Sequence, residues 1–242
     1  MDERCLIGVD GCKAGWIAVS AKSYKFSDLK VQLFPDFQTL ARSFPPASLI
    51  AVDMPIGLPE FIGKGGRGPE TLIRPLLGER QSSVFSIPSH AAVYTHGYRD
   101  ACHVALETSN PPRKVSKQAF HLFPKIRQLD EFLLANGHEN FFEVHPELAF
   151  WKLNDEYPLQ TPKKIKGRLN PAGMKERKNL LAAIGIDRTF LNQKPPRGAA
   201  FDDLLDACAC LSVVERISQG RARSYPEKII SDDRGLPIAI WA

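Results

Sequence analysis

The sequence lacks several features that would place it in a specialised class of protein. No stretch approaches the ~20 uninterrupted apolar residues of a membrane-spanning helix, so a membrane protein is excluded. The 5 cysteines form no CxxC or CxxH pattern, and Cys208 and Cys210 lie in an apolar helical run, as small core residues do. The opening MDERCLIGVD is not the basic and then apolar pattern of a signal peptide. These absences predict a protein of the reducing cytoplasm.

Positive charge is present in moderate excess and is unevenly distributed. The net charge is +5 over 242 residues, within an ordinary globular composition of 43% hydrophobic and 24% charged residues. The excess lies mostly in three segments, PRKVSK, PKIRQ and PKKIKGRLNPAGMKERK. A basic face can bind nucleic acid by neutralising phosphates, but solvated loops and helix faces explain these segments equally well.

Acidic residues recur in or directly after apolar runs. Residues 6–9 and 16–19 read as two strands, and Asp10, Gly11 and Gly15 lie between them. In ASLIAVDMPIGLP the apolar run, typical of a central parallel strand buried on both faces, ends at Asp53. The segment NFFEVHPE contains a further acid, Glu143. Desolvating a carboxylate costs several kcal/mol unless something compensates, so these acids call for a role beyond stability.

The rest of the chain alternates between strands and helices. A third strand is expected over LKVQLFPDF and a short helix over FQTLARSF. After the strand that precedes Asp53, the segment GKGGRG is expected to form a mobile glycine loop. Residues 69–137 read as mainly helical, and one helix runs from Ser116 to Asn136 with a break or kink at Pro124. Further helices are predicted over PELAFWKL, KERKNLLAAIG and AAFDDLLDACACLSVVERISQG, and a last strand over GLPIAIWA.

This order of elements predicts an α/β protein with the ribonuclease H-like fold. Three antiparallel strands are then extended by parallel strands into a mixed sheet flanked by helices, in a single domain 1–242 with a helical insertion, 57–140, over the cleft. The first and fourth strands are neighbours in such a sheet, so Asp10 and Asp53 are expected side by side. The last helix offers Asp203 and Asp206 on one face, while Asp202 fits a helix cap.

Six ordered blocks carry a resemblance to a known family. They are GVDGCKAGWIAV, AVDMPIGLP, RQSSVFSIP, SKQAFHLFPKIRQLDEFL, EVHPELAFWKL and DDLLDACA. Together they resemble domain-of-unknown-function family 429, described as predicted ribonuclease H-like nucleases related to Holliday-junction resolvases, over nearly the whole chain. The resemblance implies that Asp10, Asp53, Asp203 and Asp206 are catalytic acids and metal ligands, with Glu143 as a further ligand or substrate contact. The first helix has no glutamate, which favours the resolvase arrangement over ribonuclease H itself.

The resulting hypothesis is a metal-dependent nuclease or phosphodiesterase that acts on nucleic acid. Clustered carboxylates suit Mg²⁺ or Mn²⁺, and a pair of such ions stabilises both the attacking and the leaving oxygen in phosphodiester cleavage. His145 is a metal ligand, a general base or, as we favour, a structural or orienting residue. A basic loop at the rim of the cleft is expected to hold Lys163, Lys164, Lys166 and Arg168. The predicted substrate contacts are Ser83, Lys117, Lys125, Lys164 and Arg168.

Two other functions remain open on the sequence. The chain could be a catalytically degenerate ribonuclease H-like module that binds nucleic acid or another protein. It could also be a phosphotransferase, because VDGCKAGWIAV resembles the phosphate loop of sugar kinases and actin-like ATPases. Those enzymes close two such domains on a nucleotide, and the sequence contains no second phosphate motif.

Overall fold

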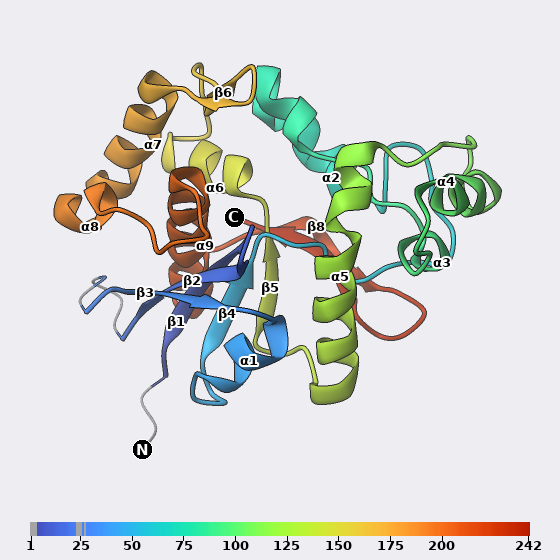
Figure 1. The fold of residues 1–242 in the computed structure, drawn as a ribbon, viewed down its shortest axis with the longest axis horizontal. Coiled ribbons are helices and arrows are strands. Elements are labelled where there is room, and N and C mark those ends of the chain that lie inside the picture. The colour runs from blue at the N-terminus through green and yellow to red at the C-terminus, as the bar shows by residue number, and fades with distance from the viewer. Residues whose placement is uncertain (1–3, 23–25, 27) are drawn as a thin grey trace.

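A mixed seven-stranded sheet forms the centre of the molecule (Figure 1). The computed structural model describes residues 4–22, 26 and 28–242. Across the sheet the strands follow the order β3-β2-β1-β4-β5-β9-β8. They span β1 Leu6–Cys12, β2 Gly15–Ala21, β3 Lys30–Phe34, β4 Leu49–Val52, β5 Phe141–Val144, β8 Ser224–Ser231 and β9 Pro237–Trp241.

The strand directions confirm the predicted fold class. β1, β2 and β3 are antiparallel, β4 is parallel to β1, and β5 and β9 continue the parallel part. β4 lies between β1 and β5, and all of its residues are buried, as its continuous apolar run predicted. β8 pairs antiparallel with β9 at the far edge and was not predicted. The sheet is therefore the mixed sheet of a ribonuclease H-like protein.

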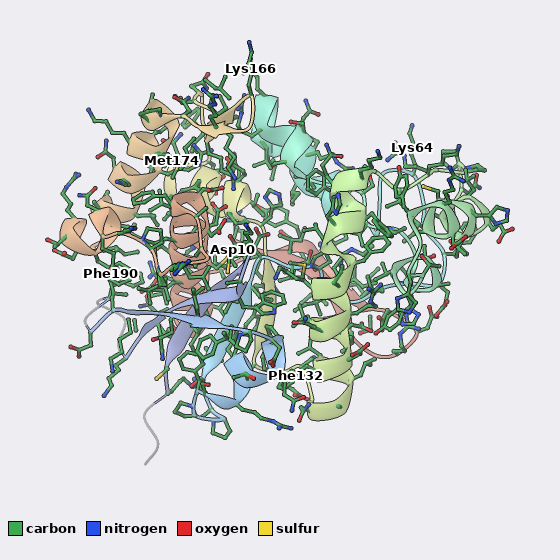
Figure 2. The ribbon with its side chains drawn as sticks, viewed as in Figure 1. Asp10, Lys64, Phe132, Lys166, Met174 and Phe190 are labelled. Atoms are coloured by element: carbon green, nitrogen blue, oxygen red, sulfur yellow. The ribbon has the colours of Figure 1, made fainter. Side chains whose placement is uncertain are left out.

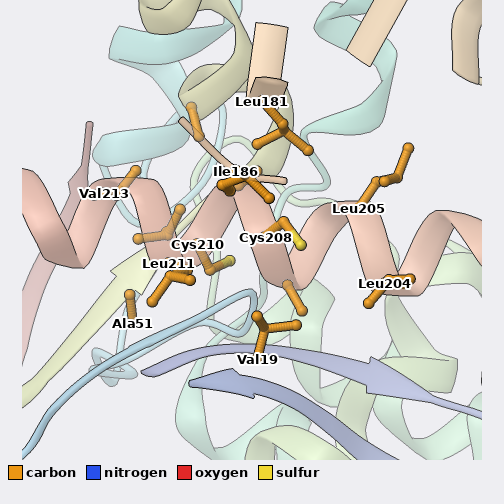
Figure 3. Close-up of a cluster of buried hydrophobic side chains, with 14 of the residues drawn as sticks. Val19, Ala51, Leu181, Ile186, Leu204, Leu205, Cys208, Cys210, Leu211 and Val213 are labelled. Carbon is orange, nitrogen blue, oxygen red and sulfur yellow. The ribbon is translucent and has the colours of Figure 1, made fainter. Parts of the chain in front are cut away.

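One face of the sheet is covered by α9, Phe201–Ser218, which packs against β1 more extensively than against any other element. Gly8 makes this approach possible, because a Cβ there would lie 2.1 Å from the carbonyl oxygen of Ala207. Figure 3 shows the contact layer, in which Leu204, Cys208 and Leu211 of α9 lie among apolar side chains of the sheet and of the outer helices. The outer layer on this side is formed by α6, Pro146–Leu153, α7, Pro171–Ala183, and α8, Arg188–Asn192.

The opposite face carries α1, Phe37–Arg42, and α5, Lys117–Asn136, with α3, His90–Val93, and α4, Tyr98–Glu107, further out. Ser116 caps α5 by accepting a hydrogen bond from the amide of Ala119. The sequence predicted a break or a kink at Pro124. A break is wrong, because α5 continues through that residue as one helix. Pro124 is exposed, whereas Phe123 and Ile126 beside it are buried against the sheet, so packing on both sides outweighs the lost hydrogen bond.

The remaining elements lie around the carboxyl ends of the parallel strands. They are α2, Pro69–Ile73, the 3₁₀ helix η1, Arg74–Ser83, and a small hairpin of β6, Lys164–Ile165, and β7, Arg168–Leu169. In Figure 1, α2 and β6 stand above the end of the sheet at which β1 and β4 finish. None of the helices in the described ranges is both long and apolar enough to pass through a bilayer.

Candidate functional site

Three carboxylates from three different elements meet at this end of the sheet. Asp10 is in β1, Asp53 directly follows β4, and Asp206 is in the second turn of α9. One oxygen of each lies within 4.8 Å of the others, a spacing that could hold a metal ion. In Figure 2 Asp10 lies near the middle of the molecule, between the columns of α9 and α5.

Strand register and side-chain alternation bring Asp10 and Asp53 together. β1 and β4 are neighbours, as predicted, with Val9 beside Val52, and the amide of Asp53 donates to the carbonyl of Val9 at 2.9 Å. Side chains alternate between the two faces of a strand. Val9 and Val52 belong to the core on the α5 side, so the acids that follow them point to the α9 side, where Asp206 lies.

Burial makes the fully ionised form of this cluster unfavourable unless a cation offsets its negative charge. It raises the pKa of Asp10 well above its ordinary value, and the neighbouring carboxylates of Asp53 and Asp206 raise it further. Burial and the Asp206 charge likewise raise the pKa of Asp53 to about 7. The pKa of Asp206 is also raised, because its burial outweighs the opposing effect of Lys163. The cluster therefore retains protons at a pH at which ordinary carboxylates have lost theirs.

Lys163 supplies the positive charge nearest the cluster. Its ammonium forms an ion pair with Oδ2 of Asp206. Burial alone would lower the pKa of Lys163, but the Asp206 carboxylate overcomes this and raises it above the usual lysine value. The second oxygen of Asp206, Oδ1, is buried without a hydrogen-bond partner among the described residues. One oxygen thus faces the lysine, and the other is left for a further ligand.

Glu143 lies beside the cluster but on the other face of the sheet. Its neighbours in β5, Phe142 and Val144, pack with the core on the α9 side, so Glu143 points to the opposite side. There Arg67 holds both of its carboxylate oxygens, at 2.6 and 3.1 Å, and the amide of Ile56 donates to it at 2.7 Å. Burial raises the pKa of Glu143 more than Arg67 lowers it. The structure thus gives Glu143 an arginine partner rather than a place among the three clustered carboxylates.

The other two acids in the first turn of α9 also have partners of their own. Asp203 accepts a hydrogen bond from the amide of Ala200 at 2.7 Å and so caps the helix. Asp202, which the sequence offered as the cap, is buried and forms an ion pair with Lys164 at 2.5 Å. Of the two acids expected on one face of this helix, the structure brings Asp206 to the other carboxylates and places Asp203 at the first turn.

A pocket of about 270 Å³ opens over the cluster. It is lined by residues from the sheet, from the segment between β4 and β5, and from the region around α6. These include Asp10, Asp53, Met54, Arg67, Glu70, Ser83, Val84, Phe85, Ile87, Leu122, Lys125, Glu143, His145, Glu147 and Lys163. Acidic, basic and apolar groups therefore share one concave site, as is usual for the binding site of a small molecule.

The side chain of Lys125 extends from α5 to the start of β2 and lines this pocket. Its ammonium donates to the carbonyl of Gly15 at 2.5 Å and lies 5.0 Å from the ring centre of Trp16. Burial lowers the pKa of Lys125. A Cβ at Gly11 would lie 2.7 Å from the lysine side chain, so a larger residue at this position would displace Lys125. The predicted substrate contact at Lys125 thus lies in the pocket and also joins α5 to the β1–β2 turn.

The other predicted substrate contacts lie at varying distances from the site. Ser83 lines the pocket, although its hydroxyl donates to the carbonyl of Arg80. Lys117 is exposed in the first turn of α5 and is not part of the pocket lining. Lys164 and Arg168 lie on the exposed β6–β7 hairpin, and Figure 2 shows Lys166 of the same hairpin at the outer edge of the molecule. Of the basic loop expected at the cleft rim, Lys163 enters the pocket itself.

His145 lines the pocket where β5 leads into α6. Its Nε2 lies 3.4 Å from the carbonyl oxygen of Ser83, and Nδ1 is buried without a partner in the described part of the chain. Burial lowers the pKa of His145, so the imidazole is neutral at pH 7. The imidazole therefore lies between η1 and α6, and its role stays a prediction.

Two buried arginines around the pocket form ion pairs that were not anticipated from the sequence. Arg67, from the glycine loop expected to be mobile, is buried and binds Glu70 at 2.8 Å as well as Glu143. Arg177 of α7 is fully buried and donates to both oxygens of Glu147, at 2.6 and 2.8 Å, which ties α7 to α6. The available signal for Arg67 was its type: Lys64 and Arg67 are the long side chains of GKGGRG, and arginine is the residue better suited to buried ion pairs.

A family model matches most of the chain. The model of a family described as a protein of unknown function (DUF429) matches residues 8–229. No curated protein matches the chain, and no solved structure does. The matched range contains Asp10, Asp53 and Asp206, so the whole carboxylate cluster lies within the family domain.

Proposed function

This chain belongs to the DUF429 family of proteins of unknown function, and we propose that it is a divalent-metal-dependent phosphodiesterase that acts on nucleic acid. One observation carries the proposal. Asp10, Asp53 and Asp206 converge within 4.8 Å, Asp10 and Asp53 line a pocket, and a cation bound there would offset the clustered negative charge. A cluster kept only for stability would be expected to have each carboxylate paired, as Glu143 is by Arg67.

The donor set fits Mg²⁺ or Mn²⁺. All three groups are carboxylates, which are hard oxygen donors of the kind that these ions prefer. The unpartnered Oδ1 of Asp206 is a buried acceptor that a cation would satisfy. Asp10, Asp53 and Asp206 would hold the ion, with Lys163 on the other oxygen of Asp206. When bound, such an ion supplies Lewis-acid polarisation of a phosphoryl oxygen and activation of water.

Two lysines would position the phosphate. The raised pKa of Lys163 means that it keeps its proton, so it acts as a fixed positive charge rather than as a proton donor. An ammonium has three N–H donors, and Asp206 accepts from Lys163 in the structure, which leaves donors for a non-bridging phosphate oxygen. Lys125 lines the pocket with a second ammonium. Both groups favour the dianionic charge that develops at phosphorus during the reaction.

The reaction is hydrolysis of one ester bond. The oxygen of a water molecule forms a bond to phosphorus, and the bond from phosphorus to the ester oxygen breaks. One proton of the water passes to the departing alkoxide, which leaves as an alcohol, and a phosphate monoester remains. His145 is neutral and lines the same pocket, where it would orient the segment that carries Ser83.

Nucleic acid is the favoured partner on grounds of charge. The chain carries a net charge of +5, and Lys117, Lys166 and Arg168 are exposed on α5 and on the β6–β7 hairpin. Such groups neutralise phosphates outside the pocket and contribute affinity without sequence preference.

Metal titration and cleavage together test the proposal. Calorimetric titration of the wild-type protein with Mg²⁺ and Mn²⁺ should show binding, and Asp53→Asn should weaken it and abolish cleavage of a panel of DNA, RNA and hybrid strands. The matched control is Asp100→Asn, the same change of charge on the exposed surface of α4. Absence of metal binding at millimolar concentration would overturn the mechanism. Nucleic-acid binding without cleavage would favour a degenerate binding module.

A further inference from the structure

The pocket over the carboxylates is bounded by contacts that join its walls. These contacts link the segment between β4 and β5 to the rest of the site at three places. They are Lys125 to the carbonyl of Gly15 at 2.5 Å, Arg67 to Glu143 at 2.6 Å, and His145 to the carbonyl of Ser83 at 3.4 Å. These contacts hold the walls of the pocket in fixed positions relative to one another, so the space between them has a defined size.

The volume of the pocket suits a small ligand such as a single nucleotide. Small-molecule pockets have volumes of about 300–1,000 Å³, and the pocket here, at about 270 Å³, is slightly smaller than that range. An internal phosphodiester in a duplex has nucleotides on both sides and a paired strand beside it. An open groove accommodates such a substrate, whereas a bounded pocket accommodates a terminus.

The lining combines phosphate-binding and base-binding chemistry. Asp10, Asp53 and Lys163 provide the charged part. The apolar part comes largely from the segment after η1 and from α5, with Phe85 and Leu122 both half-buried and available for contact. Aromatic and apolar side chains bind the faces of nucleobases without reading their sequence.

We propose that the pocket holds a single nucleotide, with its phosphate at the carboxylates and its base against Phe85 and Leu122. The inference rests on the proposed phosphodiesterase function and specifies its substrate: a strand end or a small nucleotide ester. The interior of a duplex or of a four-way junction is not a substrate. Specificity of this kind arises from the insertion between β4 and β5, since this segment contributes the base-binding wall.

Binding measurements test the pocket independently of turnover. Calorimetry in Mg²⁺ should show one site for thymidine 5′-monophosphate, bound about tenfold or more tightly than inorganic phosphate. Leu122→Ala and Phe85→Ala should each remove most of this difference while the affinities for Mg²⁺ and inorganic phosphate stay unchanged, which also shows that the variants are folded. The control is Leu134→Ala, an exposed leucine on the same helix. Equal affinity for nucleotide and inorganic phosphate would overturn the inference.

A cleavage assay separates this inference from the function on which it rests. A linear single strand should be degraded from an end, and a closed circle of the same sequence should resist. Cleavage of the circle at the rate of the linear strand would overturn the inference and leave the phosphodiesterase function standing. If neither is cleaved but thymidine 5′-monophosphate binds in a way that depends on Leu122, the nucleotide pocket is supported and the proposed hydrolysis is overturned.

Discussion

Replacing Asp53 with asparagine is expected to stabilise the metal-free protein at pH 8 and to leave its stability at pH 4 almost unchanged. Burial and the charge of Asp206 raise the pKa of Asp53 from 3.8 to about 7. Between these two values the folded protein holds a proton that the unfolded chain releases. The free energy of unfolding therefore falls as the pH rises through this window, and the stability conferred by the protonated group is lost above about pH 7.

The magnitude follows from the width of the window. A shift of about three pKa units, at about 1.4 kcal/mol per unit, corresponds to about 4 kcal/mol. Asp53 is partly exposed, and water screens part of this effect, so we expect about 2 kcal/mol. For a chain of this length, 2 kcal/mol raises the midpoint of thermal unfolding by about 4–8 °C. Asparagine imitates the protonated acid because its amide can donate to the carboxylate of Asp10.

The assay is thermal and urea unfolding, followed by circular dichroism from pH 4 to pH 8 in the presence of a chelator. The wild type should lose stability across this range, and Asp53→Asn should show a shallower decline. With Mg²⁺ in excess the order should reverse at pH 8, because only the wild type retains the full set of ligands. The reasoning is refuted if the two proteins have parallel pH profiles, or if the variant is less stable than the wild type at pH 8 without metal.

Four further outcomes are expected. Asp206→Asn should reduce the affinity for Mg²⁺ at least tenfold in calorimetry. Asp203→Asn should keep that affinity and lower the free energy of unfolding by about 1 kcal/mol, because the helix cap is weakened. Equal losses of Mg²⁺ affinity in the two variants would contradict these separate roles. Arg67→Met should cost about 3–5 kcal/mol in urea unfolding, because it leaves two buried glutamates unpaired, and a loss below 1 kcal/mol would count against a buried network. Gly8→Ala should destabilise the protein by about 1–3 kcal/mol or more in thermal unfolding, while Gly63→Ala, which has open space around it, should not. Binding of a single-stranded oligonucleotide should weaken steeply with salt in fluorescence anisotropy, and a flat salt profile would argue against phosphate contacts.

Local pattern was enough to predict most of the secondary structure and the fold class. Apolar runs bounded by turns located β1, β4 and β5, and helical spacing located α5 and α9. These signals are short-range, because the burial of one or both faces of a helix or strand determines which nearby residues in the sequence are apolar. β8 was missed for the same reason: most of its residues are exposed, so its sequence shows neither an apolar run nor an alternation.

Two acids of the site were also readable from the sequence, although β1 was predicted to end before Asp10 and in fact continues to Cys12. Asp10 and Asp53 each follow an apolar run, and the order of the elements makes their strands neighbours. The sequence could not show which other acids join them. Asp203 and Asp206 lie on the same helix, but only Asp206 reaches the cluster, since the carboxylate of Asp203 binds the amide of Ala200.

Only the tertiary structure decided how the charges around the site are paired. Glu143 is separated from the cluster by the alternation of β5, and it meets Arg67, which is 76 residues away in the chain. Lys163 reaches Asp206 across 43 residues. Pairings of this kind depend on which faces pack together in three dimensions, and no local pattern encodes them. The sequence by itself therefore determined the fold class, the core strands and helices, and the two acids Asp10 and Asp53, and the packing of α9 and the β4–β5 segment against the sheet determined the site.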